Sequence, residues 1–402
     1  MKAAVVGLGV EGKSALKSLL NRDIEVYASD LDKNIIITPH KNIEVDLGFH
    51  DFDKIESADV VLISPSLWNF EQFQSTKSHG KLLSDVFNRH KSILTIGVTG
   101  TNGKTTTCLM IQDIFQKAGY NVLTGGNAGG GFEGYSEIIL EAENKKFNVL
   151  VVEVCDMTLD FCRDSFEFDL VVVTNHGRDH LDVHGSQEDY LNSLKKLITG
   201  TKAVLNGNYP LLAELGDNAH EVHYFHDTKR DLKVFGKFNQ ENAAAAAKVG
   251  EIVGILPDVI DEALNSFEGA QGRIEVLEIS GSKLIIGKTD NADAIQAVMD
   301  EIKFEVVIVG TPRRNEHWRF EMLKEVEKKD PQIIALFPGL DNTISEARDA
   351  LKNYPGEIIE LSNINEVIKF ARESLKKYSK VFLGGNGQLK IIKIRNELIK
   401  TA

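Results

Sequence analysis

Short runs of hydrophobic residues alternate with longer amphipathic stretches along most of the chain. The runs are rich in β-branched and aliphatic residues, which is typical of buried strands, and the stretches between them have helical spacing. Such runs stand in the middle of the chain at 94–99, 148–154, 168–174 and 201–206. Continuous apolar strands with helices between them indicate parallel sheets that are covered on both faces. The pattern therefore predicts an α/β protein.

One of these strands leads into a glycine-rich loop and then into a helix. Gly100 and Gly103 allow the backbone to turn tightly, and Lys104 and Thr105 open the helix. A loop of this kind directs backbone N–H groups and a helix N-terminus at one point, where they bind phosphate. We expect Lys104 to reach the terminal phosphates of ATP and the Thr105 hydroxyl to bind Mg²⁺.

A second glycine turn lies near the N-terminus. Gly7, Gly9 and Gly12 follow the G-x-G-x-x-G spacing, and Asp30 ends the next strand-like run, where a carboxylate can meet ribose hydroxyls. This is a dinucleotide-binding fingerprint, so a nicotinamide dehydrogenase is one interpretation. However, the second glycine loop begins near residue 97, and the roughly 90 residues before it are few for a full dinucleotide-binding fold.

Polar residues stand after two of the central strands, where ligands of parallel sheets bind. Glu153 ends an apolar run, and a carboxylate there needs a partner such as a metal ion, a lysine or backbone amides. The segment TNHGRDHLDVHGS contains His176, His180 and His184 at a spacing of four, which by itself suggests zinc. Two glycines within the segment argue against one regular helix through all three histidines.

Composition argues against several classes of partner and site. A formal net charge of −13 repels polyanions, so we expect no nucleic acid partner. No apolar run approaches the ~18 residues of a membrane span and no signal peptide is recognisable, so we expect a cytoplasmic protein with no membrane partner. Three cysteines without a C-x-x-C pair predict neither a disulfide framework nor a cysteine zinc site.

Several motifs resemble those of the Mur ligases. TGTNGKTTT is similar to their ATP-binding loop, and Val98 in place of the first P-loop glycine is a variant of that family. The segment 174–186 resembles the family's TN-x-x-x-DHLD-x-HG, KFNQENAAAAA its G-x-x-N-x-x-N-A-x-A-A, and FEGAQGRIE its F-x-G-x-x-x-R-x-E hinge. VVGLGVEGKSA resembles the UDP-binding N-terminal domain of the type that adds D-glutamate.

The resemblance implies three domains and an ATP-dependent acid–amino-acid ligase. We expect a Rossmann-like, substrate-binding N-terminal domain over 1–91, a central P-loop ATPase domain with a parallel sheet over 92–274, and a C-terminal Rossmann-like α/β domain for the amino acid over 275–402. Such an enzyme activates a carboxylate as an acyl phosphate and joins an amino acid to a nucleotide-linked cell-wall precursor, releasing ADP and phosphate. We expect a monomer that uses ATP and Mg²⁺.

The resemblance also implies roles for individual residues. Catalytic roles are expected for Lys104, His180, Lys195 and Arg273. The expected ATP contacts are Gly100, Thr101, Asn102, Gly103, Lys104, Thr105, Thr106, Asn239, Asn242 and Arg273. The expected metal ligands are Thr105, Glu153 and His180, and the expected substrate contacts are Gly7, Gly9, Gly12, Asp30, Asn127, Asp156 and Thr158.

Lys195 is the candidate for a carbamate, which several Mur ligases form from a lysine and CO₂ near the second Mg²⁺. The family offset from Tyr190 falls on Leu194, so Lys195 or Lys196 must take the role, and the distance from His180 favours Lys195. Because the reaction needs a neutral amine, we expect a partly desolvated side chain. The alternative is that both are solvated helix lysines.

Other segments depart from the family pattern and leave the acceptor open. The D-glutamate-adding type has S-S-F-Q-L where this chain has VCDMTLD (154–160), and GKTDNADA (287–294) replaces the usual motif of the C-terminal domain. An archaeal pseudomurein peptide ligase and a methanogen tetrapyrrole-cofactor synthetase of the same ancestry are alternatives. A P-loop NTP-binding switch without ligase activity is the alternative from another class.

Overall fold

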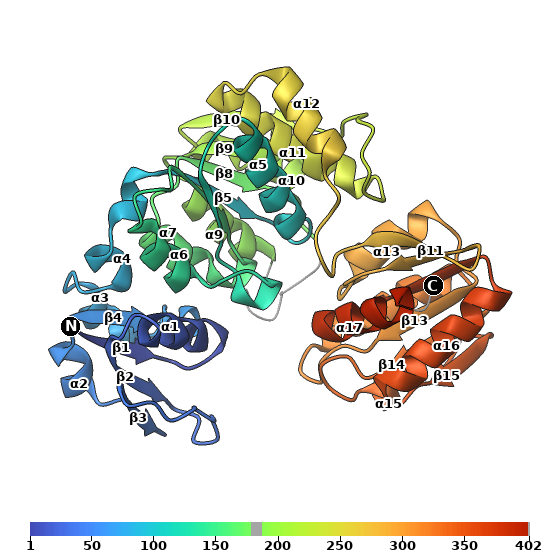
Figure 1. Cartoon of the computed structure of the whole chain (residues 1–402), viewed down its shortest axis with the longest axis horizontal. Helices are drawn as coiled ribbons and strands as arrows, with labels where there is room; N and C mark the ends of the chain where they lie inside the picture. Colours follow the sequence, from blue (N-terminus) through green and yellow to red (C-terminus); the bar gives the residue numbers. More distant parts are fainter. Residues whose placement is uncertain (178–186, 401–402) are drawn as a thin grey trace. The chain divides into compact units, whose positions relative to one another are not determined.

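The computed structural model describes residues 1–177 and 187–400, which form three sheets with helices between their strands (Figure 1). Of this described chain, residues 1–176, 187–226 and 244–263 form one compact unit, and residues 227–243 and 264–400 form a second. The predicted α/β class is confirmed. None of the described helices is long and apolar enough to cross a membrane.

The first sheet has four parallel strands in the order β3-β2-β1-β4. Its strands are β1 (Lys2–Val6), β2 (Glu25–Asp30), β3 (Ile43–Leu47) and β4 (Val60–Ile63). The helices of this part are α1 (Val10–Leu20), α2 (Phe52–Ser57), η1 (Pro65–Leu67), η2 (Glu71–Phe73), α3 (Gln74–Lys77), α4 (Leu83–Val86) and η3 (Arg89–Ser92). Because the strands are parallel, the loops that follow them meet at one edge of the sheet.

The second sheet has six parallel strands in the order β10-β9-β8-β5-β7-β6. They are β5 (Leu94–Thr99), β6 (Val122–Gly125), β7 (Val149–Glu153), β8 (Leu170–Val173), β9 (Lys202–Asn206) and β10 (Glu221–Phe225). The described helices here are α5 (Lys104–Lys117), η4 (Ala128–Gly130), α6 (Tyr135–Ala142), η5 (Asp156–Thr158), α7 (Leu159–Ser165), α9 (Gln187–Ile198), α10 (Pro210–Ala213), η6 (Gly216–Asn218), α11 (Phe238–Val253) and α12 (Pro257–Ser266). Every residue of β7 and β8 is buried, as their continuous apolar runs predict.

The third sheet lies in the second unit and has the order β11-β12-β16-β13-β14-β15. Its strands are β11 (Glu275–Ile279), β12 (Ser282–Ile286), β13 (Val306–Gly310), β14 (Ile333–Phe337), β15 (Glu357–Glu360) and β16 (Lys380–Gly385), and β11 pairs with β12 antiparallel while the other pairs are parallel. The helices are α13 (Ala292–Glu301), η7 (His317–Phe320), α14 (Glu321–Lys328), α15 (Ile344–Ala350), α16 (Ile364–Lys377) and α17 (Gln388–Ile399). Buried side chains form a hydrophobic cluster on each face of this sheet.

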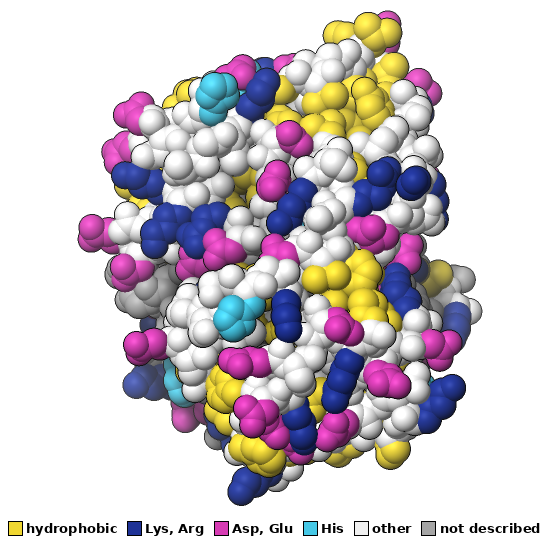
Figure 2. All heavy atoms as spheres, turned by 90° about the vertical axis from the view of Figure 1, so that its left-hand side faces the viewer, with side chains coloured by type: hydrophobic (Ala, Val, Ile, Leu, Met, Phe, Trp, Pro, Cys, Tyr) yellow, Lys and Arg dark blue, Asp and Glu magenta, His cyan; other side chains and the backbone are white. Residues whose placement is uncertain are grey.

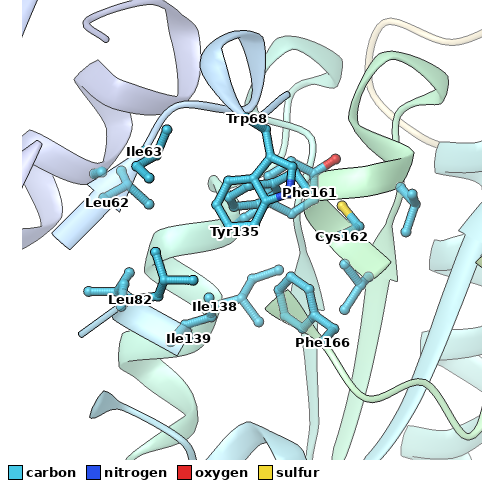
Figure 3. Close-up of a cluster of buried hydrophobic side chains, with 14 of the residues drawn as sticks. Leu62, Ile63, Trp68, Leu82, Tyr135, Ile138, Ile139, Phe161, Cys162 and Phe166 are labelled. Atoms are coloured by element: carbon cyan, nitrogen blue, oxygen red, sulfur yellow. The ribbon is translucent and has the colours of Figure 1, made fainter. Parts of the chain in front are cut away.

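The first two sheets share one hydrophobic core. Trp68, which follows η1, packs edge-on against Phe161 of α7 with ring centroids 5.0 Å apart, and Tyr135 of α6 lies 5.4 Å from the same ring (Figure 3). The indole N–H of Trp68 also donates a hydrogen bond to Asp164 Oδ2 at 2.9 Å. Each buried aromatic side chain of this kind contributes on the order of 2 kcal/mol. The three sheets fall within the three predicted segments, and the domain limits at 91 and 274 stay predictions.

Glu11 joins α1 to the start of α6. Its carboxylate accepts hydrogen bonds from the backbone N–H groups of Tyr135 and Ser136 at 3.1 and 2.9 Å, and from Ser136 Oγ at 2.7 Å. The side chain caps a helix N-terminus from another part of the chain, where a carboxylate is favoured. Burial nevertheless raises the pKa of Glu11 from 4.5 to about 7, against the lowering effect of these hydrogen bonds.

This raised pKa predicts a pH-dependent stability. The folded state holds a proton on Glu11 that the unfolded state releases near pH 4.5, so the stability from this group is complete below that pH and is lost as the pH rises through about 7. The loss amounts to ~3 kcal/mol for a shift of this size. In urea unfolding between pH 4.5 and 8, we expect a smaller decrease for Glu11→Gln than for the parent. Equal pH slopes for the two proteins would contradict the prediction.

Candidate active site

The strand, loop and helix around Lys104 have the predicted order, as β5, residues 100–103 and α5. Gly100 has a φ of 123° and Gly103 a φ of 84°, which are backbone conformations that L side chains rarely adopt. A Cβ atom at Gly100 would also lie 2.3 Å from Thr174 Oγ1 and 2.9 Å from the carbonyl oxygen of Asn175. Both glycines are therefore required by the loop, and their spacing brings it onto the N-terminus of α5.

The residues after β8 form hydrogen bonds with this loop. Asn175 accepts a hydrogen bond from the backbone N–H of Asn102 at 2.9 Å, and its Nδ2 donates to the Asn102 carbonyl at 3.0 Å. The Thr174 hydroxyl donates to the same carbonyl at 2.6 Å. The position of Asn175 directly after an apolar strand predicts that it faces this loop, because strand ends in a parallel sheet share one edge. The structure confirms this, and the hydrogen bonds of Thr174 and Asn175 with Asn102 were not predicted.

Lys104 lies over its own loop. Its Nζ donates hydrogen bonds to the carbonyls of Gly100 at 2.6 Å and Thr101 at 3.0 Å, and lies 3.8 Å from Asp156 Oδ1. The Lys104 side chain is 13% exposed and that of Asp156 is 2% exposed, so this ion pair is largely removed from water. A positive charge in such surroundings interacts strongly with an anion that reaches the loop. Lys104 is thus placed to contact a phosphate.

Glu153 and Thr105 form an oxygen-rich pair beside Lys104. The Thr105 hydroxyl donates a hydrogen bond to Glu153 Oε2 at 2.5 Å, and Asn127 Nδ2 donates to Oε1 at 2.8 Å. Glu153 ends β7 and is 1% exposed. Hydroxyl and carboxylate oxygens are the ligands that Mg²⁺ prefers, and both kinds of oxygen meet here. The donor set therefore fits Mg²⁺.

The remaining metal and carbamate predictions concern the histidine segment and α9. His180 and His184 lie outside the described residues, whereas His176 stacks on Tyr190 of α9 with ring centroids 5.4 Å apart. Within residues 1–177 and 187–400 no group of three or more His, Cys, Asp or Glu side chains could hold a metal.

The environment expected of a carbamylated lysine is not found at Lys195. Both Lys195 and Lys196 are exposed, whereas the preceding residue, Leu194, is fully buried. The expected partial desolvation of Lys195 is therefore wrong, because the buried face of α9 turns Leu194 inward and the next two residues outward. The exposed side chains match the alternative of solvated helix lysines.

Three residues near the second sheet that were predicted to contact the substrate form hydrogen bonds or ion pairs within the protein. Thr158 Oγ1 donates to the Cys155 carbonyl at 2.9 Å and lies 2.8 Å from the Tyr135 hydroxyl. Asn127 binds Glu153, and Asp156 pairs with Lys104, as described above. Their contacts with a substrate stay predictions, and the bonds place Asn127 and Asp156 next to the Lys104 loop.

The three glycines of the first glycine turn differ in whether another residue could replace them. Gly7 has a φ of 87°, and a Cβ atom at Gly12 would lie 1.8 Å from the Gly7 carbonyl oxygen. A Cβ atom at Gly9 would meet nothing within 4 Å. Asp30, which was expected at ribose hydroxyls, accepts a hydrogen bond from the backbone N–H of Leu8 at 2.5 Å through Oδ2. The turn is thus held by the chain itself, and it is open at Gly9.

Asn239, Asn242 and Arg273 belong to the second unit. Asn239 Nδ2 donates to the Phe235 carbonyl at 2.7 Å, and Asn242 Nδ2 donates to Asn239 Oδ1 at 2.9 Å. These bonds fix the start of α11, where the family motif was recognised. The predicted contacts of the three residues with ATP stay predictions.

A buried charge cluster in the second unit was missed by sequence reasoning. Asp290 lies 3.2 Å from Lys288 and 3.1 Å from Arg319, whose other carboxylate partner is Glu316 at 3.2 Å. Burial alone would raise the pKa of Asp290, but the positive charges of Lys288 and Arg319 hold it well below its usual range. The cluster stands after β12 and β13, within the GKTDNADA and TPRRNEHWR segments that depart from the family pattern.

Comparison with known proteins shows a similarity to Mur ligases. The family model described as the Mur ligase middle domain matches residues 98–230. The UDP-N-acetylmuramoylalanine–D-glutamate ligase of Caldanaerobacter subterraneus subsp. tengcongensis is 27% identical over 94% of this chain and 92% of its own. The enzyme of the same name from Pelotomaculum thermopropionicum is 28% identical over 83% of this chain and 82% of its own. The chain therefore contains a segment that matches the Mur ligase middle domain and is similar to Mur ligases over most of its length.

Solved structures of Mur ligases share the fold. A pseudomurein peptide ligase type C from Methanothermus fervidus is 22% identical, covers 100% of this chain and 99% of its own, and has a TM-score of 0.63. The UDP-N-acetylmuramate–alanine ligase MurC from Thermotoga maritima is 18% identical with the same coverage and a TM-score of 0.64. The three-domain α/β fold expected from the sequence is therefore shared with Mur ligases.

Proposed function

We propose that the Lys104 loop binds ATP with Mg²⁺ and that the chain activates a carboxylate as an acyl phosphate before joining it to an amine. The observation that carries this proposal is the convergence of Lys104, Thr105 and Glu153 at the carboxyl ends of β5 and β7. The loop supplies backbone N–H groups for phosphate, and the pair of Thr105 and Glu153 supplies oxygen ligands. Neither a nucleophilic serine nor a nucleophilic cysteine is needed for this chemistry.

The reaction follows from the chemistry of a carboxylate, which is a poor electrophile. A carboxylate oxygen attacks the γ-phosphorus of ATP, the bond from phosphorus to the ADP oxygen breaks, and an acyl phosphate forms. The amine nitrogen then attacks the acyl carbon, the amide bond forms, and inorganic phosphate leaves. Lys104 neutralises charge on the phosphoryl group during transfer, and Asp156 holds the Lys104 ammonium at the loop.

Thr105 and Glu153 are the described residues that would hold Mg²⁺, which supplies charge neutralisation for the phosphates when bound. His180 would contribute to a second Mg²⁺, and Arg273, Asn239 and Asn242 would contact the nucleotide, as the family motifs imply. The ammonium group of the incoming amino acid must lose a proton to become a nucleophilic amine. The amino acid must also be bound with this amine facing the acyl phosphate.

The partners proposed for the reaction are ATP, an amino acid and an acyl acceptor that binds the first sheet. The similar enzymes from Caldanaerobacter and Pelotomaculum are named for a UDP-linked acceptor and D-glutamate. A nucleotide-linked cell-wall precursor is accordingly the acceptor class to test first. Because the reaction needs ATP, we propose that it takes place in the cytoplasm.

Release of inorganic phosphate from ATP tests the proposed ligase activity. We expect release to require both a carboxylate acceptor and an amine, with UDP-N-acetylmuramoyl-L-alanine and D-glutamate as the first pair and other amino acids as the next. Mass spectrometry of the product should show one water fewer than the sum of acceptor and amine. Phosphate release at an equal rate without acceptor and amine would instead indicate an NTP-driven switch.

A further inference from the structure

The Tyr135 hydroxyl closes a ring of three hydrogen bonds around Cys155. It accepts the backbone N–H of Cys155 at 3.1 Å and lies 2.8 Å from Thr158 Oγ1. The Thr158 hydroxyl donates its single proton to the Cys155 carbonyl at 2.9 Å, so the Tyr135 hydroxyl is the donor to Thr158. The backbone N–H and the carbonyl of Cys155 are thus both held by side chains.

The ring follows directly on the hydrogen bonds of the second sheet. The Val154 N–H donates to the Val98 carbonyl of β5 at 2.9 Å, and the next N–H, that of Cys155, donates to Tyr135. Asp156 comes after both, at the start of η5. These residues belong to segment 154–160, in which the chain departs from the Mur ligase pattern. The ring therefore fixes the backbone just before Asp156.

Cys155 connects the ring to Asp156 and Lys104. Its thiol donates to Asp156 Oδ1 at 3.3 Å, and the same oxygen lies 3.8 Å from Lys104 Nζ. On the face of the molecule in Figure 2, basic side chains lie among acidic ones at the surface, where water screens their interactions. The pair of Asp156 and Lys104 is largely removed from water, so its strength depends more steeply on the distance between the two charges.

Tyr135 is itself fixed from two sides. Its backbone N–H donates to Glu11 Oε2 at 3.1 Å, at the start of α6. Its ring packs against those of Phe161 and Phe166, with centroids 5.4 and 6.2 Å apart, and Tyr135 is only 2% exposed (Figure 3). A side chain that is locked by packing and by its backbone holds its hydrogen-bond partners within a narrow range of positions.

We propose that Tyr135 is a positioning residue that holds Asp156, and through it Lys104, in the arrangement that receives the phosphates of ATP. This inference rests on the ATP binding proposed above and adds a residue that lies outside the Mur ligase motifs of the sequence. The hydroxyl acts through the Cys155 backbone and the Asp156 carboxylate. Thr158, which the sequence predicted as a substrate contact, serves the ring in this proposal.

Calorimetric titration of the full chain with ATP and Mg²⁺, without acceptor or amine, tests the role of Tyr135. Tyr135→Phe removes only the hydroxyl, and loss of its hydrogen bonds should weaken ATP binding about fivefold. Tyr354→Phe is the matched control, because Tyr354 is also buried and its hydroxyl donates to the Pro331 carbonyl in the second unit. The control should lower the unfolding midpoint and bind ATP like the parent. Equal ATP affinities of the two variants would overturn the inference.

A double-mutant cycle shows whether Tyr135 acts through Asp156. Asp156→Asn removes the charge that faces Lys104 and preserves the size of the side chain. If the hydroxyl works by placing this carboxylate, adding Tyr135→Phe to Asp156→Asn should change the ATP affinity by less than about twofold. A fivefold loss in both backgrounds would show that the hydroxyl stabilises the fold alone, and would refute the positioning role.

Thr158 gives an independent test, because it supplies one side of the ring. Thr158→Val removes the hydroxyl at nearly constant volume and should weaken ATP binding as Tyr135→Phe does. The double variant should bind no more weakly than either single variant, since each substitution breaks the same ring. Thr158→Ser keeps the hydroxyl and should recover most of the loss. A serine variant as weak as the valine variant would refute the ring.

The positioning role and the ligase activity can fail separately. Titration with ATP involves no carboxylate activation, so ring-dependent ATP binding by a chain that forms no amide would support the positioning role and refute the ligase reaction. Amide formation with equal ATP affinities for the parent and Tyr135→Phe would support the reaction and refute the positioning role. A parent that binds no ATP would refute both.

Discussion

Lys104→Ala should lower the rate of ATP-dependent amide formation by at least two orders of magnitude while the protein remains folded. The Lys104 ammonium lies over the glycine loop, where it contacts the carbonyls of Gly100 and Thr101, and is largely shielded from water. Loss of one preorganised group that stabilises transition-state charge costs ~3 kcal/mol, which corresponds to about a hundredfold in rate. Removal of the ammonium also takes a positive charge from beside the buried Asp156 carboxylate, so the loop would attract the phosphates of ATP less strongly.

Single-turnover phosphate release and ATP titration together measure this effect. We expect both a slower chemical step and weaker ATP binding in Lys104→Ala. Lys117→Ala is a matched control, because Lys117 ends the same helix and its side chain is 33% exposed in an ion pair with Glu262. The control should stay within about twofold of the parent, since exposed ion pairs contribute little. Turnover in Lys104→Ala equal to that of the control would contradict the assigned role.

Glu153→Gln should give the second large loss, through Mg²⁺. The substitution preserves the size of the side chain, and a glutamine carbonyl oxygen can still accept the hydrogen bond of Asn127. It removes the buried negative charge that the Thr105 hydroxyl now faces at 2.5 Å. A neutral amide is a weaker ligand for a hard divalent cation than a carboxylate. We expect turnover to fall by about a hundredfold and half-maximal activity to need more Mg²⁺.

Direct binding of Mn²⁺ in place of Mg²⁺, followed by electron paramagnetic resonance in the presence of ADP, gives a readout that does not depend on activity. Glu153→Gln should bind Mn²⁺ more weakly than the parent. Glu133→Gln, at an exposed position in the same unit, is the control and should bind like the parent. Unchanged Mn²⁺ affinity in Glu153→Gln would show that Glu153 pairs with Thr105 and Asn127 for structural reasons alone.

The strands and the phosphate loop could be predicted because their signals are local in the sequence. The apolar runs that became β7 and β8 are uninterrupted, which only strands buried on both faces tolerate. Gly100, Gly103 and Lys104 stand within five consecutive positions, so the conformation of that loop is specified by its own residues. For the same reason the order of strand, loop and helix around Lys104 was predicted correctly.

The partners of the predicted residues could not be derived in this way. Asp156 and Lys104, or Glu153 and Thr105, are about fifty positions apart in sequence, and Glu11 meets the start of α6 across more than one hundred. No period or spacing relates such positions, because parallel strands return to the same edge only after a helical crossover of variable length. The hydrogen bonds of Asn175 with Asn102 and of Asp30 with the Leu8 N–H also join distant positions, so only the structure shows them.

Exposure was the other property that the tertiary structure decided. The family offset shifted the carbamate role from Leu194 to Lys195, but packing of α9 buries Leu194 and leaves Lys195 in solvent. Val10, Leu31, Phe49 and Phe70 are separate hydrophobic residues in the sequence, and parallel pairing of four strands brings their loops to one edge. The sequence by itself determined the α/β class and the glycine loop before α5, which depend on neighbouring residues, whereas the tertiary structure decided the charge pairs and the exposure of single side chains, which depend on how distant strands align.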